Sequence, residues 1–101
     1  MLSRVVCLGV LLGYVGAAEA VDAGIKELYS TYCASCHSAK GAQAPEAFNV
    51  SVWKGRLDKG AEKVLANTIK GIGNMPPQGM CIECTQTDLK ELIRYMSGTA
   101  R

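Results

Sequence analysis

Apolar side chains recur at helical spacing in three separate stretches of the chain. The first stretch follows Asp22, a residue suited to cap a helix, and continues to about Cys33. The second covers residues 60–70 and the third covers residues 87–97. In each stretch the spacing predicts one apolar helical face. These faces consist of Ile25, Leu28, Tyr29 and Tyr32; of Ala61, Val64, Leu65, Thr68 and Ile69; and of Leu89, Leu92, Ile93 and Met96.

Turn and capping residues mark the ends of these helices. Gly71 and Gly73 follow the second stretch and Gly98 follows the third, and glycine is common just past the C-terminus of a helix. Before the third stretch, Thr85 and Asp88 resemble a capping box with Asp in place of Glu. We therefore expect three helices with defined boundaries.

The connecting segments lack this period. Residues 37–49 predict a loop, whereas residues 53–57 predict one short helical turn. Pro76 and Pro77 fix φ and remove two backbone donors, so we expect residues 74–79 to form a stiff, extended loop. No stretch predicts a strand, and the fold is therefore expected to be all-α. Loops this long are unusual in so small a domain unless they surround something large.

The first twenty residues have the order of features that is typical of a secretory signal peptide. Arg4 supplies a positive charge, residues 5–16 are almost wholly apolar, and Ala18-Glu19-Ala20 is a small-x-small cleavage site. A membrane anchor is the alternative, but a spanning helix needs about 20 apolar residues and this run is shorter. We expect residues 1–20 to be removed, which leaves one domain at residues 21–101 without stable membrane insertion.

Composition and charge narrow the class of protein. The 101-residue chain carries a formal net charge of +2, with 11 Lys and Arg against 9 Asp and Glu. No stretch is basic enough for a nucleic-acid binder. Of the 5 cysteines, Cys7 falls in the predicted signal peptide. The even number left in an exported chain is consistent with cysteines that are oxidised or otherwise occupied.

Residues 33–37, Cys-Ala-Ser-Cys-His, carry the C-x-x-C-H signature of covalent haem c attachment. Cysteines three residues apart lie on the same side of a helical turn, so each thiol can add to one vinyl group of the porphyrin. The next residue, His37, is then placed to bind the iron as the proximal axial ligand. The sequence thus predicts one haem c, attached to Cys33 and Cys36.

Two other interpretations of the cysteines compete with haem. A redox-active C-x-x-C of the thioredoxin type usually lies in a βαβ context, which this sequence does not predict. A zinc site would use Cys33 and Cys36 together with Cys81 and Cys84. The gap between these pairs is longer than in common zinc ribbons, and zinc would leave His37 without a role.

His37 is the one histidine of the chain, so the sixth ligand of the iron must be Met, Lys, Asn or water, or the position is empty. Met75 heads the rigid Met-Pro-Pro segment, and a stiff loop presents a weakly binding thioether at little entropic cost. Met75 is therefore the expected ligand and Met80 the reserve, while Met96 is expected in the core. His/Met ligation closes both axial positions. It favours electron transfer over a haem enzyme or gas sensor with an open sixth site.

Together these residues resemble the class I c-type cytochromes, and within them the cytochrome c5 subgroup. The likeness lies in C-x-x-C-H, in the Met-Pro-Pro-x-Gly-x-Cys-x-x-Cys pattern of residues 75–84, and in Trp53, Arg56 and Gly60. It covers roughly residues 25–96. It implies the all-α cytochrome c fold, with the first and last helices crossing and loops wrapping the haem. Residues that match the crossing are Tyr29, Leu92 and Tyr95, with Gly24 or Ile25 near the contact.

The resemblance also implies a function and further site residues. His37 and Met75 would be the axial iron ligands, and Cys81 and Cys84 would form a disulfide that does not hold haem. The family implies a soluble periplasmic electron carrier rather than an enzyme. Its redox partners would be membrane cytochrome complexes and terminal reductases or oxidases, and a monomer or weak dimer is expected.

Several side chains near the motif have two interpretations each. Trp53 is expected either to give its indole N–H to a haem propionate or to pack in the core. Arg56 either pairs with a propionate, since its fork suits carboxylates, or lies at a solvated helix end. Five lysines either steer an acidic partner or form an ordinary soluble surface. They are Lys40, Lys54, Lys59, Lys63 and Lys70.

Overall fold

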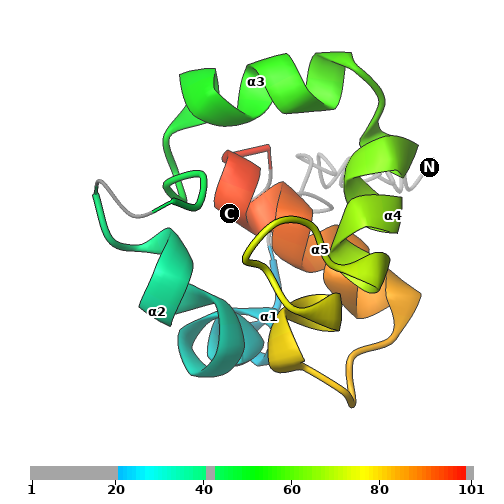
Figure 1. The fold of residues 1–101 in the computed structure, drawn as a ribbon. Helices are drawn as coiled ribbons and strands as arrows, with labels where there is room; N and C mark the ends of the chain where they lie inside the picture. Colours follow the sequence, from blue (N-terminus) through cyan, green and yellow to red (C-terminus); the bar gives the residue numbers. More distant parts are fainter. Residues whose placement is uncertain (1–20, 41–42, 100–101) are drawn as a thin grey trace, which may run out of the picture.

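The structure is a computed structural model that describes residues 21–40 and 43–99. The predicted signal peptide lies outside these residues. Within them the chain is helical and forms no strand (Figure 1), which confirms the expected all-α fold. No helix in this described part is long and apolar enough to cross a membrane.

The N-terminal helical segment has three parts. Helix α1 (Ala23–Leu28) passes into a π-helical turn (Tyr29–Cys33), which passes into α2 (Ala34–His37). Asp22 caps the segment as predicted, since its Oδ1 accepts a hydrogen bond from the N–H of Ile25 at 2.9 Å. The helix therefore continues through the whole C-x-x-C-H motif. The π turn, which ends at the first cysteine of the motif, was not predicted, and such turns are frequent at functional sites.

Helices α3 (Val50–Asp58) and α4 (Ala61–Lys70) follow a loop. Helix α4 confirms the second predicted helix, and Gly71 caps its C-terminus with a φ of 87°. Helix α3 is longer than the single turn that the sequence predicted. Only Trp53 of this helix is buried, so α3 has no apolar stripe that a search for helical periodicity can detect.

The segment between α4 and α5 differs from the extended loop that was predicted. Pro76 is extended, with a ψ of 161°, but Pro77 begins a 3-10 turn that ends at Met80. Proline suits the first position of a helical turn, because its φ is already fixed there and its missing N–H would have no partner. Gln78 and Gly79 then have left-handed φ values of 58° and 59°. The prediction was wrong because it extended the constraint of the prolines to residues beyond them.

Helix α5 (Gln86–Ser97) has the predicted capping box and contacts α1, α3 and α4 (Figure 1). Thr85 Oγ1 accepts from the N–H of Asp88 at 3.0 Å, and Asp88 Oδ2 accepts from the N–H of Thr85 at 2.9 Å. Gly98 ends the helix in the left-handed conformation, with a φ of 80°. Helix α5 is therefore the element on which the others assemble.

The core lies where the N-terminal segment packs against α5. Tyr29 and Tyr95 meet edge to face, with ring centroids 5.3 Å apart. Ile25 and Leu92 are buried in the same core, whereas Gly24 is exposed. The contact between the first and last helices is thus present as predicted, and Ile25 rather than Gly24 contributes to it.

Candidate functional site

A cavity of about 660 Å³ opens between α2, α3, α4, α5 and the segment between α4 and α5. Its volume lies within the range of about 300–1,000 Å³ that is typical of small-molecule and cofactor sites. Apolar side chains of α4 and α5 form one wall. The other wall residues that bear on chemistry are Cys33, Cys36, His37, Trp53, Arg56, Lys59, Lys63, Met75, Met80 and Met96.

The two thiols predicted to attach the haem both line the cavity, Cys33 from the end of the π-helical turn and Cys36 from α2. Neither Cys33 nor Cys36 is in a disulfide; Cys33 is half-buried and Cys36 is exposed. Burial raises the pKa of the Cys33 thiol to about 11, so this thiol is neutral at pH 7. A redox-active C-x-x-C depends on a lowered thiol pKa. The environment of Cys33 is therefore unlike that of a thioredoxin-type site.

His37 is buried and its ring is held in one orientation. Its Nδ1 lies 2.7 Å from the carbonyl oxygen of Pro45. A carbonyl can only accept, so Nδ1 carries a proton in this hydrogen bond, and in the neutral imidazole Nε2 is then the nitrogen with the lone pair. The N–H of Ala47 donates in turn to the His37 carbonyl at 2.7 Å, and the Trp53 ring lies 5.8 Å from the imidazole. This arrangement leaves Nε2 as a ready metal ligand, oriented by a second-shell hydrogen bond.

Met75 lies on the same cavity wall as His37. Its backbone pairs with Ile72 in both directions, with N···O distances of 2.9 and 3.1 Å. Met80 is 65% exposed, whereas Met96 is buried in the core as expected. The structure thus brings the expected axial ligand and His37 to one cavity, although they are far apart in sequence.

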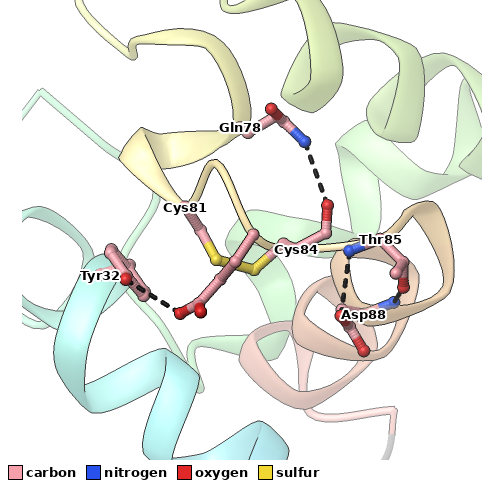
Figure 2. The surroundings of a disulfide bond; sticks show 7 residues. Tyr32, Gln78, Cys81, Cys84, Thr85 and Asp88 are labelled. Carbon is pink, nitrogen blue, oxygen red and sulfur yellow. Dashed lines mark hydrogen bonds between the residues drawn. A yellow bond between two sulfur atoms is a disulfide. The ribbon is translucent and has the colours of Figure 1, made fainter.

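Cys81 and Cys84 form a disulfide, with Cα atoms 5.4 Å apart (Figure 2). Cys81 is fully buried and Cys84 is 5% exposed. Because these two sulfurs are bonded to each other, they cannot serve as thiolate ligands. The four-cysteine zinc interpretation is therefore wrong for this structure.

The disulfide loop, residues 81–84, forms hydrogen bonds with two other segments of the chain. Gln78 Nε2 donates to the carbonyl oxygen of Cys84 at 3.1 Å (Figure 2). Tyr32, from the π-helical turn, donates its hydroxyl to Glu83 Oε1 at 3.0 Å. The loop therefore connects the N-terminal segment with the segment that carries Met75.

Trp53 and Arg56 both lie on the cavity wall. Trp53 is 4% exposed and its Nε1 donates to the carbonyl oxygen of Glu46 at 2.9 Å. Arg56 is exposed, and its Nη1 donates to the carbonyl oxygen of Val52 at 2.8 Å. In this structure Trp53 is a core residue whose N–H already has an acceptor. Contact of either residue with a propionate stays a prediction.

The five lysines fall into different environments. Lys59 and Lys63 lie on the cavity wall beside Arg56, and no carboxylate from the described residues lines that wall. Lys54 instead pairs with Asp58 at 2.8 Å. Lys40 and Lys70 are exposed and do not line the cavity.

Three groups at the site were missed by sequence reasoning: the Pro45 carbonyl, Gly71 and Gln78. A backbone carbonyl carries no signal of residue type. Gly71 was recognised only as a helix terminator, because its contact with the Met75 backbone depends on the folded loop. Nothing in the sequence marks Gln78, since glutamine is not a typical residue for a left-handed turn.

The chain resembles known proteins along most of its length. The family model described as cytochrome c oxidase, cbb3-type, subunit III matches residues 20–96. Cytochrome c5 of Ectopseudomonas mendocina is 36% identical over 85 residues, which cover 82% of this chain and 93% of that protein. Cytochrome c5 of Azotobacter vinelandii is 35% identical over 74 residues, covering 71% and 89%.

A solved structure shares the fold. It is the crystal structure of an electron transfer complex of nitrite reductase with cytochrome c. The matching chain is 33% identical, with a TM-score of 0.68, and the match covers 80% of this chain and 99% of that one.

The helical fold, the C-x-x-C-H turn and the cavity beside it define a class I c-type cytochrome. The cavity has the two thiols and the imidazole nitrogen that a covalently bound haem c requires. The chain belongs to this family, as a member of the cytochrome c5 type. Its cofactor is haem c, and its function is that of an electron carrier.

Proposed function

We propose that this cytochrome is an exported, periplasmic carrier that shuttles single electrons between membrane cytochrome complexes and terminal reductases or oxidases. Cys33 and Cys36 attach the haem, and His37 and Met75 bind its iron. The observation that carries the proposal is a single cavity bordered by both thiols, by Met75, and by His37, whose Nδ1 is held by the Pro45 carbonyl oxygen.

The haem supplies one-electron chemistry at its iron when it is bound. His37 contributes Nε2, and its hydrogen bond to Pro45 keeps the ring from rotating and makes the imidazole a stronger donor. Met75 contributes a thioether, which favours the reduced state and raises the reduction potential. Leu92 and Ile93 of α5 line the cavity with apolar side chains. With His37 and Met75 both bound, the iron would have no free position for a substrate.

Two observations support export. The order of charge, apolar run and small residues in residues 1–20 is that of a secretory signal peptide. The Cys81–Cys84 disulfide is of a kind that persists in oxidising compartments such as the bacterial periplasm.

The charges at the cavity mouth favour acidic redox partners. Arg56, Lys59 and Lys63 all line the cavity, and no carboxylate of the described residues lines it. The related cytochrome c was crystallised with a nitrite reductase, and we infer that this chain meets a terminal reductase of comparable chemistry. It does so as a monomer or a weak dimer.

The visible spectrum of the purified, exported protein tests the proposal. We expect sharp bands in the reduced state that carbon monoxide does not alter. In the oxidised state we expect the weak far-red methionine-to-iron band. Prompt binding of carbon monoxide to the reduced protein would instead indicate an open sixth site, as in a haem enzyme or gas sensor.

A further inference from the structure

The Met75 side chain lies against the 3-10 turn that follows it. A Cβ placed on Gly79 would be 3.5 Å from Cε of Met75, so the end of the Met75 side chain lies next to the turn Pro77–Met80, with room for one further carbon between them. The pairing of Met75 with Ile72 fixes only the backbone. The position of the turn therefore limits where the sulfur can lie.

That turn contains a backbone conformation that its residue does not favour. Gln78 has φ of 58° and ψ of 14°, in the left-handed region that is uncommon for residues other than glycine, asparagine and aspartate. A conformation of this kind persists when the surroundings hold it. The surroundings of Gln78 should therefore contain the groups that keep the turn in place.

Those groups belong to the disulfide loop, residues 81–84. The side-chain Nε2 of Gln78 donates to the Cys84 carbonyl oxygen at 3.1 Å (Figure 2). The N–H of Cys81 donates to the Gln78 carbonyl oxygen, also at 3.1 Å. Both cysteines are buried, and Thr85 directly after them caps α5. The disulfide loop thus holds Gln78 through its side-chain amide and through its backbone carbonyl.

We propose that Gln78 is a positioning residue: its amide clamps the turn beside Met75 to the disulfide loop and so keeps the thioether in the cavity. The inference rests on the proposed role of Met75 as an axial ligand. The clamp acts on the equilibrium between a closed state, with Met75 at the iron, and an open state in which the turn has moved away. Local openings of this kind are distinct from global unfolding.

The open fraction is measurable with imidazole as an external ligand. Imidazole competes with Met75 for the iron, and its apparent affinity scales with the fraction of molecules in the open state. Loss of one neutral hydrogen bond should raise that affinity by about three- to tenfold. The far-red methionine-to-iron band reports the displacement directly.

The experiment uses the haem-loaded protein and two changes at Gln78. Gln78→Glu keeps the shape but replaces the amide donor with an acceptor, and Gln78→Gly removes the amide while accommodating the left-handed φ without strain. Gln86→Glu is the matched control, because Gln86 is exposed in the first turn of α5. Ile25→Val is the control for general destabilisation, since Ile25 is in the core and does not line the cavity.

Both Gln78 variants are expected to bind imidazole about three- to tenfold more tightly than the parent, while Gln86→Glu is unchanged. Ile25→Val should lower Tm and leave imidazole affinity as it was. If imidazole affinity is unchanged in both Gln78 variants, the clamp is wrong but the Met75 ligation stands. The same conclusion follows if Ile25→Val raises imidazole affinity as much as the Gln78 variants do. A parent protein without the far-red band, or a band that survives Met75→Ala, overturns the proposed ligation and the clamp with it.

Discussion

Gly71 lies directly against the backbone of Met75. A Cβ on Gly71 would be 2.9 Å from the Met75 carbonyl oxygen and 3.0 Å from the backbone nitrogen of Pro77. The residue also has a φ of 87°, which L side chains rarely adopt. One glycine therefore both ends α4 and allows the Met75 segment to pack on the end of that helix.

Replacing Gly71 tests the importance of this contact for stability and for the site. Gly71→Ala should destabilise the protein by about 1–3 kcal/mol, the cost of a strained backbone conformation, and should weaken the far-red methionine-to-iron band. Thermal unfolding and the oxidised spectrum measure the two effects.

The control for Gly71 is another glycine of the same chain. A Cβ on Gly55, in α3, would meet nothing within 4 Å, so Gly55→Ala should stabilise the protein by about 0.5–1 kcal/mol. If Gly71→Ala behaved like Gly55→Ala and left the band intact, the close contact with Met75 would have no effect on the site.

The axial ligand can be assigned by comparing two methionines. Met75→Ala should open the sixth position, so that the reduced protein binds carbon monoxide, and the reduction potential should fall. Met80→Ala removes a side chain that is 65% exposed and should change neither property. The opposite pattern, with carbon monoxide binding only after Met80→Ala, would transfer the ligand role to Met80.

The disulfide is expected to act locally. Replacing Cys81 and Cys84 by Ser opens a loop with a sequence separation of only 3, so the loss of stability should be at the low end for disulfides, about 2 kcal/mol. The same change should weaken the far-red band, because the loop anchors the turn beside Met75. If both the haem spectrum and Tm were unchanged, the disulfide would have no role in stiffening this region.

Tyr29 should make stability depend on pH above neutrality. Burial, with a further contribution from nearby Tyr95 and Cys33, raises the pKa of Tyr29 above its usual value of 10.0. The folded state then holds this proton more tightly than the unfolded state does. The resulting stabilisation is complete below about pH 10 and is lost as pH rises through the folded-state pKa.

Tyr29→Phe is the variant that tests this pH dependence. Far-UV circular dichroism should show Tm falling less steeply between about pH 9 and about pH 11 than in the parent, because the titrating group is gone. The substitution keeps the aromatic ring that packs on Tyr95. Identical slopes in the two proteins would contradict the prediction.

The two lysines that line the cavity, Lys59 and Lys63, should affect the rate of electron exchange with anions. Replacing Lys59 and Lys63 by Gln should slow the oxidation of the reduced protein by ferricyanide about threefold at low ionic strength and flatten the salt dependence of the rate. Lys54→Gln is the matched control, since Lys54 is already paired with Asp58. A rate that does not depend on salt in the parent would show that these lysines do not steer anions.

The sequence contained enough information for the helices that have an apolar stripe. Helices α4 and α5 and the N-terminal segment each bury one face, and their caps at Asp22, Thr85 and Gly98 are local interactions between residues close in sequence. Helix α3 escaped prediction because it buries little besides Trp53. Its place in the fold depends on tertiary contacts that no local pattern records.

The same distinction applies to the site. The attachment motif is five consecutive residues, so C-x-x-C-H alone indicates haem c. The orientation of His37 depends on the carbonyl of Pro45 eight residues away, and the turn beside Met75 depends on the carbonyl of Cys84. Backbone groups supply these contacts, and any residue type can provide a backbone carbonyl.

The edge-to-face contact between Tyr29 and Tyr95 has a consequence for the order in which the protein is made and matured. It joins the first helix to the last, so the core cannot close until nearly the whole chain is available. The N-terminal segment is synthesised first, and a helix of its length is marginally stable alone. We therefore expect Cys33 and Cys36 to stay accessible to an incoming haem until α5 packs on this segment.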